Sequence, residues 1–431
     1  MVSVNSWAVR RAVGCGAVIV AGLLVGCNNN PWQDDAAASN TLYSAVIENS
    51  PRHLDPTASY WSNDTPYTYQ IYEPPYAYHY LKRPFQLTPK SAREVVKPYY
   101  VDKNGQRLPD DAPAEMVAES IYDVPIKPGI LYQPHPALAK DDKGNYVYHA
   151  MKPGELGERR TPLDFEHQGT RELVAEDFVY ALKRQATTRI TAPIFSTFAE
   201  YVVGLKEYGE LVKLEDAKLR QGLDKASQDK PFLDFRRWPL AGASAPEKQL
   251  LRIRIKGKYP QWNYWMQMTF MAPVPWEADA FYAQPGMAER ALTLDTWPVG
   301  TGAYMMVEYV KDRYHVMKRN PNYRGEAYPC EGMPRRQRGR PARRLRQDDA
   351  LHRHLGLEHR ARGRASARQV PPGLLRRRSI RAHRHRHGLS GRDARLGRSA
   401  QRVPRQGFPA RALLRRQQLL HRLQHARPDD R

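Results

Sequence analysis

The sequence predicts a mixed α/β or α+β fold for its first 332 residues, on three observations. Residues 250–256 alternate apolar and basic side chains, which is the pattern of a half-buried strand. Residues 304–309 and 314–319 flank a short polar connection and predict a hairpin. Residues 175–184 and 198–208 carry apolar side chains at helical spacing. Strands and helices mixed along one chain in this way indicate layers of both kinds.

The two predicted helices differ in how clearly their ends are marked. The first opens at Ala175-Glu176-Asp177 and closes at Lys183-Arg184, so its charges complement the helix dipole. The second has no such marks, but five residues recur at helical spacing and predict one buried face: Phe198, Tyr201, Val202, Leu205 and Tyr208.

Charge is distributed very unevenly along the 431 residues. The net charge is +23, and residues 333–431 account for all of it with 29 arginines, no lysine and 6 acidic residues. The first 332 residues hold 39 basic and 39 acidic residues and are therefore neutral. Basicity consequently says nothing about the ligand of this part.

The amino terminus has the features of an export signal. Arg10 and Arg11 precede fourteen mostly apolar residues, 12–25, which is too short a run to span a bilayer. The segment 24–27, Leu-Val-Gly-Cys, resembles the bacterial lipobox, which implies acylation of Cys27 and a membrane anchor of lipid. We expect a signal peptide over 1–26 and a flexible polar tether over 27–41. The alternative is an ordinary cleaved signal with an incidental cysteine.

The three cysteines agree with this interpretation. Cys15 leaves with the signal, Cys27 is the lipidation site, and Cys330 remains as a lone thiol. A disulfide framework is therefore not expected. The residue after Cys27 is Asn28, which by resemblance favours the outer membrane.

A folded region is expected from Leu42 onward. Residues 41–47 have the composition of a strand, and Pro51, Asp55 and Pro56 end it. Residues 60–80 are dense in Tyr, Trp and Pro, which indicates half-buried aromatic packing or, alternatively, a ligand-facing surface.

Four motifs in order carry a resemblance to a known family. They are 54–56 (Leu-Asp-Pro), 71–74 (Ile-Tyr-Glu-Pro), 174–184 (Val-Ala-Glu-Asp-Phe-Val-Tyr-Ala-Leu-Lys-Arg), and the pair 297–304 (Trp-Pro-Val-Gly-Thr-Gly-Ala-Tyr) with 318–325 (Lys-Arg-Asn-Pro-Asn-Tyr-Arg-Gly). Together they resemble the family 5 extracellular solute-binding proteins, which serve ABC transporters. We interpret Gly300 and Gly302 as a tight turn against a neighbouring strand.

The resemblance implies a bilobed, periplasmic-binding-protein-like fold of type II, in the large peptide-binding subclass. Residues 42–332 then form a partial solute-binding domain, incomplete at the carboxyl end, and we expect the chain to be truncated and impaired in ligand binding. Such a protein captures extracytoplasmic oligopeptides, closes on them by a hinge and delivers them to a membrane permease. The alternative ligands within the family are haem and nickel complexes. The long stretch between Leu54 and Val174 favours peptides.

The resemblance also suggests a ligand site just after the first strand. Glu48, Asn49 and Ser50 occupy the place where the family often lines its cleft, and a surface loop is the alternative. No nucleophile elbow, zincin motif, P-loop or metal-spaced cysteine pair occurs, so no enzyme activity, metal or cofactor is expected.

Residues 333–431 differ in composition from everything before them. They contain no Lys, Asn, Tyr, Thr or Trp, whereas the preceding part holds all 25 Tyr and all 8 Trp. Loss of residues with AT-rich codons is what a GC-rich gene yields when it is translated out of frame. We therefore expect a frameshifted, disordered tail with transient helix near 410–423. The rival is a genuine Arg-rich nucleic-acid-binding tail, which an exported lipoprotein has little reason to carry.

Overall fold

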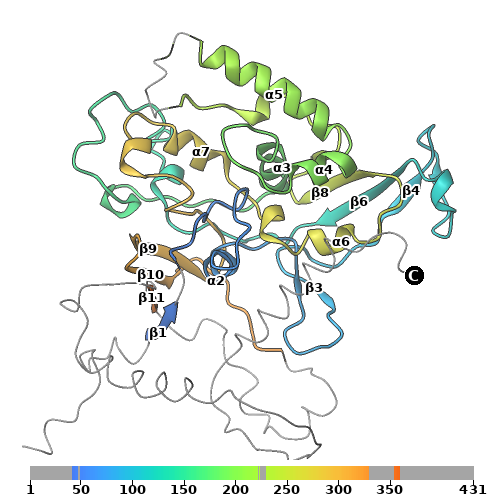
Figure 1. Ribbon diagram of the computed structural model, residues 1–431, viewed down its shortest axis with the longest axis horizontal. Coiled ribbons are helices and arrows are strands. Elements are labelled where there is room, and N and C mark those ends of the chain that lie inside the picture. Colours follow the sequence, from blue (N-terminus) through green and yellow to red (C-terminus); the bar gives the residue numbers. More distant parts are fainter. Residues whose placement is uncertain (1–40, 47–48, 222, 224–229, 330–353, 360–431) are drawn as a thin grey trace, which may run out of the picture. The chain divides into compact units, whose positions relative to one another are not determined.

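The computed structural model describes residues 41–46, 49–221, 223, 230–329 and 354–359. All of them belong to one compact unit, Asn40–Arg362. The predicted signal peptide, Cys27 and Cys330 lie outside the described residues, as does the tail apart from 354–359. The predicted mixture of helices and strands is confirmed for the described part of the chain (Figure 1).

The largest sheet has five antiparallel strands in the order β5-β4-β6-β8-β7. Their bounds are β4 Tyr99–Val101, β5 Arg107–Leu108, β6 Glu119–Pro125, β7 Ala243–Glu247 and β8 Leu250–Lys256. Strand β8 has the predicted bounds, and Leu251, Ile253 and Ile255 are fully buried. Its other face carries basic side chains, and Arg252 pairs with Asp123 directly opposite on β6. Alternation in the sequence thus determines which face of the sheet packs on the core.

Three helices accompany this sheet, and two of them pack on β8 (Figure 1). They are α3 Ala175–Arg184, α4 Phe195–Tyr201 and α5 Leu205–Leu219. Helix α3 has the predicted bounds.

The second predicted helix is wrong as a single element. Gly204 takes a left-handed conformation with φ of 72° and breaks the stripe into α4 and α5. Between them, Val202 forms an isolated β-bridge with Ile255. The stripe is nevertheless core, because Phe198, Val202, Leu205 and Tyr208 are buried.

A second sheet has four strands in the order β1-β11-β10-β9. They are β1 Thr41–Val46, β9 Tyr304–Val310, β10 Tyr314–Arg319 and β11 His354–His359. Strands β9 and β10 form the predicted hairpin, with a register shift between Val316 and Met317. Strand β11 pairs parallel to β1 and antiparallel to β10. The sequence predicts a disordered tail, whereas these six residues of the tail form a strand.

The remaining described elements are short. A hairpin pairs β2 Tyr76–Tyr78 with β3 Leu87–Pro89. The other helices are α2 Thr65–Ile71, α6 Trp262–Trp265 and α7 Trp276–Tyr282. Single 3₁₀ turns occur at η2 Ala114–Met116, η3 Pro136–Leu138, η4 Pro162–Asp164, η5 Phe235–Arg237, η6 Thr269–Met271 and η7 Ala288–Arg290.

One hydrophobic cluster joins segments that are far apart in the sequence. It runs from Leu54 and Ile71 through Phe165 and Phe281 to Met317. The dense aromatic segment 60–80 contributes to this core, since Tyr67 and Tyr72 belong to the cluster. Burial of side chains this large supplies several kcal/mol of hydrophobic stabilisation, at about 25 cal/mol per Å².

Candidate functional site

The connection between β1 and α2, which we call the Asn49–Asp64 loop, is organised by one buried carboxylate. The backbone N–H groups of Arg52, His53 and Trp61 donate to Asp64 over 2.7, 3.4 and 3.3 Å. Asp64 is fully buried, and burial raises its pKa above the ordinary value despite these donors. The two ends of the loop are therefore held to the same side chain.

The inner side of this loop joins a buried ion network. Arg184, at the end of α3, donates from both terminal nitrogens to the carboxylate of Asp55 over 2.8 and 2.9 Å. Its Nε and Nη2 also donate to Asp279 on α7, over 2.7 and 2.9 Å. Burial opposes ionisation of Asp55, but Arg184 holds the pKa of Asp55 below its ordinary value. Two of the predicted family motifs are thus in direct contact.

The outer side of the loop exposes aromatic and cationic groups. Tyr60 and Trp61 are 43% and 47% exposed, which is high for such large apolar side chains. The guanidinium carbon of exposed Arg52 lies 4.2 Å from the ring centroid of Trp61. Asn63 donates its side-chain amide to the carbonyl groups of Asn49 and Ser50, over 3.3 and 3.1 Å. This face offers stacking surface and polar groups to a ligand.

A histidine ties the loop to the segment before the Gly-Thr-Gly turn. The Nδ1 of His53 lies 3.1 Å from Oδ2 of Asp295, and the backbone N–H of Leu54 donates to the Asp295 carbonyl over 3.3 Å. The hydrogen bond that His53 donates to Asp295 raises the pKa of His53 above its ordinary value, and Asp64 and Asp55 add to this effect. A protonated His53 adds positive charge beside Arg52.

The Gly-Thr-Gly turn packs against the end of a helix. The N–H of Gly302 donates to the carbonyl of Ile71, the last residue of α2, over 2.8 Å. A Cβ on Gly300 would lie 2.0 Å from the same carbonyl oxygen, so only glycine fits there. The prediction that this turn packs against a strand is therefore wrong, because the turn packs against α2. These residues hold the fold together and contact no exposed surface of the loop.

A second ion network joins the other two motifs. Arg324 donates to both carboxylate oxygens of Glu73 over 2.7 and 2.9 Å. Lys90 pairs with Glu326 and lies 3.7 Å from Glu73. Glu73 is fully buried, so these cations neutralise a charge inside the protein.

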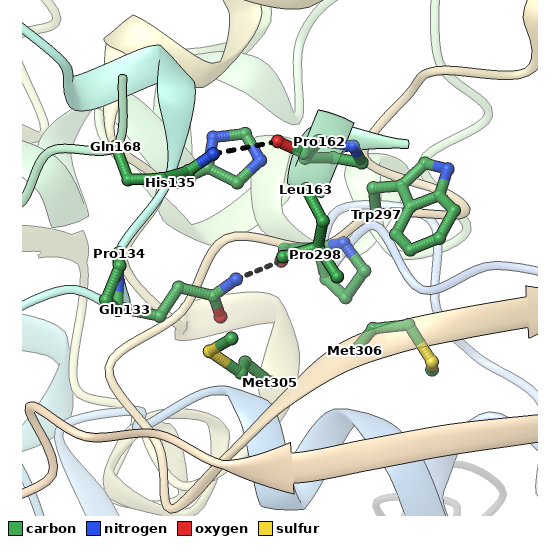
Figure 2. A pocket seen from close by; sticks show the side chains of 10 residues that line it. All are labelled: Gln133, Pro134, His135, Pro162, Leu163, Gln168, Trp297, Pro298, Met305 and Met306. Atoms are coloured by element: carbon green, nitrogen blue, oxygen red, sulfur yellow. Dashed lines mark hydrogen bonds between the residues drawn. The ribbon is translucent and has the colours of Figure 1, made fainter. Parts of the chain in front are cut away.

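The interior around His135 contains only a very small cavity, of about 10 Å³ (Figure 2). This is room for a single water molecule, which excludes a peptide or a cofactor there. Figure 2 shows Gln133 reaching the carbonyl of Pro298, to which it donates over 3.1 Å.

His135 is held neutral in this interior by burial. Its Nδ1 accepts from the N–H of Ala137 over 3.1 Å, so Nε2 carries the proton and donates to Tyr282 over 3.0 Å. The hydroxyl of Tyr282 in turn donates to the carbonyl of Trp297 over 2.5 Å. Burial lowers the pKa of His135 to about 3.

A larger hollow of about 450 Å³ opens at the start of α3. Its charged walls are largely satisfied internally, because Arg171 donates to both Asp177 and Glu277. We therefore place the candidate site on the outer side of the Asn49–Asp64 loop and not in this hollow.

The three predicted ligand-facing residues lie in different surroundings. Asn49 is exposed beside Asn63. Ser50 is 5% exposed, and its hydroxyl accepts from the N–H of Asp312 over 2.6 Å. Glu48 lies outside the described residues. Sequence reasoning did not find Arg52, Tyr60 and Trp61 as a group, and only the aromatic density of residues 60–80 signalled them.

Two further findings concern the described residues only. They contain no group of three or more His, Cys, Asp or Glu side chains arranged to hold a metal ion. Nor do they include a helix with the length and apolar character needed to cross a bilayer.

Three solved structures illustrate what this chain is similar to. OppA of Burkholderia pseudomallei is 14% identical with a TM-score of 0.40, and the match covers 76% of this chain and 42% of OppA. Listeria monocytogenes OppA bound to peptide is 12% identical with a TM-score of 0.38, over 74% and 42% of the two chains. The murein tripeptide binding protein MppA of Escherichia coli is 12% identical with the same TM-score and the same coverage. This chain therefore spans less than half the length of each.

No protein with a curated function matches the chain. The sequence of residues 167–332, which contains α3, β8 and the β9–β10 hairpin, matches the family described as "Bacterial extracellular solute-binding proteins, family 5 Middle". That family is not an enzyme family, its members are periplasmic, and the predicted α/β fold class is the one it has. Residues 167–332 of this chain are therefore similar in sequence to the family 5 bacterial extracellular solute-binding proteins.

Proposed function

We propose that this protein is the substrate-binding component of an ABC importer that captures extracytoplasmic oligopeptides. The family match over residues 167–332 carries the proposal. The contacts between the family motifs support it, because Arg184 of one motif is paired with Asp55 of another. The long segment between Leu54 and Val174 favours peptides over the haem and nickel complexes that other members of the family bind.

The outer side of the Asn49–Asp64 loop is our candidate for the ligand-facing surface. An extended peptide needs partners for its main chain and flat surface for its side chains. The side-chain amide of Asn63 donates to the backbone carbonyl of exposed Asn49, and Tyr60 and Trp61 expose aromatic rings on the same loop. Glu48 and Ser50 remain part of this proposal through their position next to Asn49.

The proposal includes delivery of the peptide to a membrane permease and a lipid anchor at Cys27. Acyl chains on Cys27 would keep the protein at the membrane, each chain contributing about 0.8 kcal/mol per buried CH₂. Labelled palmitate should enter the wild-type chain and not the Cys27→Ser variant. Equal labelling of the two would contradict the anchor.

Residues 333–431 are, in the same proposal, a segment translated out of frame and not a nucleic-acid-binding domain. Their composition supports this, since Lys, Asn, Tyr, Thr and Trp are all missing. Reading the gene across codons 325–345 tests it. A single frame that encodes this composition in several independent isolates would contradict it.

Because we expect this chain to be truncated and impaired, peptide capture is tested with the purified protein whose reading frame is restored beyond residue 332, beside the present chain. A mixed pool of short peptides is incubated with the protein, the bound fraction is identified by mass spectrometry, and affinities are measured by calorimetry. We expect the restored protein to bind intact peptides and the present chain to bind them poorly. In the restored protein, Trp61→Ala should weaken binding by about tenfold through the loss of stacking surface. The matched control is Tyr264→Ala, which removes another exposed aromatic ring, outside both the loop and residues 60–80. Binding of haem or a nickel complex alone, or cleavage of the pool, would contradict the proposal.

A further inference from the structure

Arg52 and Trp61 form a stack, and the side chain of Asp64 fixes the backbone of both residues. The N–H of Arg52 donates to Oδ1 of Asp64, and the N–H of Trp61 donates to Oδ2. The guanidinium of Arg52 then lies over the indole of Trp61, with 4.2 Å between its central carbon and the ring centroid. A guanidinium that stacks by its face keeps its N–H groups in the plane, where they point away from the ring.

A second stack in the same molecule shows what such an arginine does with these N–H groups. Arg236 lies over Trp276, 3.5 Å from the ring centroid. Its Nε and Nη2 donate to the two carboxylate oxygens of Asp234, each over 2.8 Å. The stacked arginine thus binds a carboxylate in a two-point arrangement. Arg52 has the same stack, but within the described residues its guanidinium has no hydrogen-bond or ion-pair partner.

The charges around Arg52 favour an anion. The carboxylate of Asp64 is buried and occupied by three N–H groups. Asp295 is occupied by His53, which brings a second cationic group to the loop when protonated. No described carboxylate therefore competes for the N–H groups of Arg52, whereas Asp234 occupies those of Arg236.

We propose that Arg52, stacked on Trp61, is a specificity-determining residue that binds a carboxylate of the peptide. The carboxylate comes from the carboxyl terminus or from an acidic side chain, since both present the same two oxygens. This inference rests on the proposed function and adds the chemical group that the outer side of the loop selects. Trp61 is its positioning residue.

The test uses the frame-restored protein and one peptide taken from the bound pool, prepared in three forms. The first has a free carboxyl terminus, the second is amidated and lacks acidic residues, and the third is amidated with one glutamate. We expect the wild type to bind the second form about tenfold more weakly than at least one of the others, which corresponds to about 1.4 kcal/mol. Which of the two carboxylate forms is preferred identifies the source of the carboxylate.

The variant Arg52→Gln should bind all three forms with nearly equal affinity. The matched control Arg236→Gln removes an arginine from the other stack and should keep the tenfold preference. Equal affinity of the wild type for all three forms would overturn the inference while leaving peptide capture intact. A preference that persists in Arg52→Gln would also overturn it. Failure of every peptide to bind would overturn the inference together with the proposed function.

Discussion

The inner side of the Asn49–Asp64 loop holds Asp55 against Arg184, whereas its outer side presents Arg52 and Trp61 to the surface. Both sides use an arginine, but the environments differ. Arg184 is 1% exposed and has two carboxylate partners, while Arg52 is exposed and stacks on an indole. The motif residues Leu54-Asp55-Pro56 lie on the inner side, so the family resemblance marks the part of the loop that holds the fold.

The outer side of the loop lies outside the Leu54-Asp55-Pro56 motif. Arg52, Tyr60 and Trp61 are not part of any of the four motifs that carry the resemblance. A change there leaves the buried network untouched and alters only what the surface offers to a ligand. In our proposal, ligand selectivity and folding are thus separated within one loop of sixteen residues, Asn49 to Asp64.

The strongest way to test this separation is to remove the inner arginine. Arg184→Met leaves the buried Asp55 and the half-buried Asp279 without this counter-charge, and we expect the free energy of unfolding to fall by about 3–5 kcal/mol. Urea unfolding of the full chain, followed by circular dichroism, measures the loss. The control is Arg252→Met, which breaks the ion pair with Asp123. The side chains of Arg252 and Asp123 are 36% and 30% exposed. That variant should lose less than about 1 kcal/mol. Equal losses in the two variants would show that burial does not determine how much an ion pair contributes to the free energy of unfolding.

Local sequence patterns predicted the elements that depend on nearby residues. Strand β8 follows from the alternation of Leu251, Ile253 and Ile255 with basic side chains, and helix α3 from its terminal charges. The same reasoning failed at Gly204, because a period of 3.6 residues continues through a break when the next helix presents the same face. Apolar spacing reports burial, and it does not report continuity of the backbone.

Contacts between distant residues could not be predicted from one sequence. Asp55 and Arg184 are 129 positions apart, and nothing in either motif indicates that they form a pair. The closing charges of α3 were interpreted as complements of the helix dipole, whereas Arg184 is a buried partner of two carboxylates. For the same reason the stack of Arg52 on Trp61 could not be found, since it depends on how Asp64 folds the loop.

Two histidines extend the comparison of interior and surface to pH. The pKa of His135 is lowered to about 3 in the folded protein, so between pH 6.5 and 3 only the unfolded chain takes up this proton. Its contribution to stability should therefore fall by about 2 kcal/mol from pH 7 to pH 5. His53 has the opposite sign. Its folded pKa is raised, so its contribution is complete below pH 6.5 and is lost as the pH rises through the folded value.

Unfolding free energies of the wild type, His135→Gln and His53→Gln between pH 5 and pH 8 separate these two effects. His135→Gln should flatten the acid side of the profile, and His53→Gln should flatten the side above pH 6.5. A wild-type profile that each variant reproduces without change would show that neither histidine is linked to folding.

The smallest expected effect is on the stability of variants on the outer side. Arg52→Gln removes an exposed guanidinium that has no ion-pair partner among the described residues, so it leaves no buried charge behind. The cation–π contact at an exposed site contributes about 0.5–1 kcal/mol, part of which the glutamine stem recovers by packing on Trp61. We therefore expect the free energy of unfolding of Arg52→Gln to stay within about 0.5 kcal/mol of the wild type, in the same urea experiment as Arg184→Met. A loss of several kcal/mol would mean that the stack holds the loop together. In that case the inner and outer sides would be one structural unit, and a change in peptide preference in Arg52→Gln would no longer report on a contact between Arg52 and the ligand.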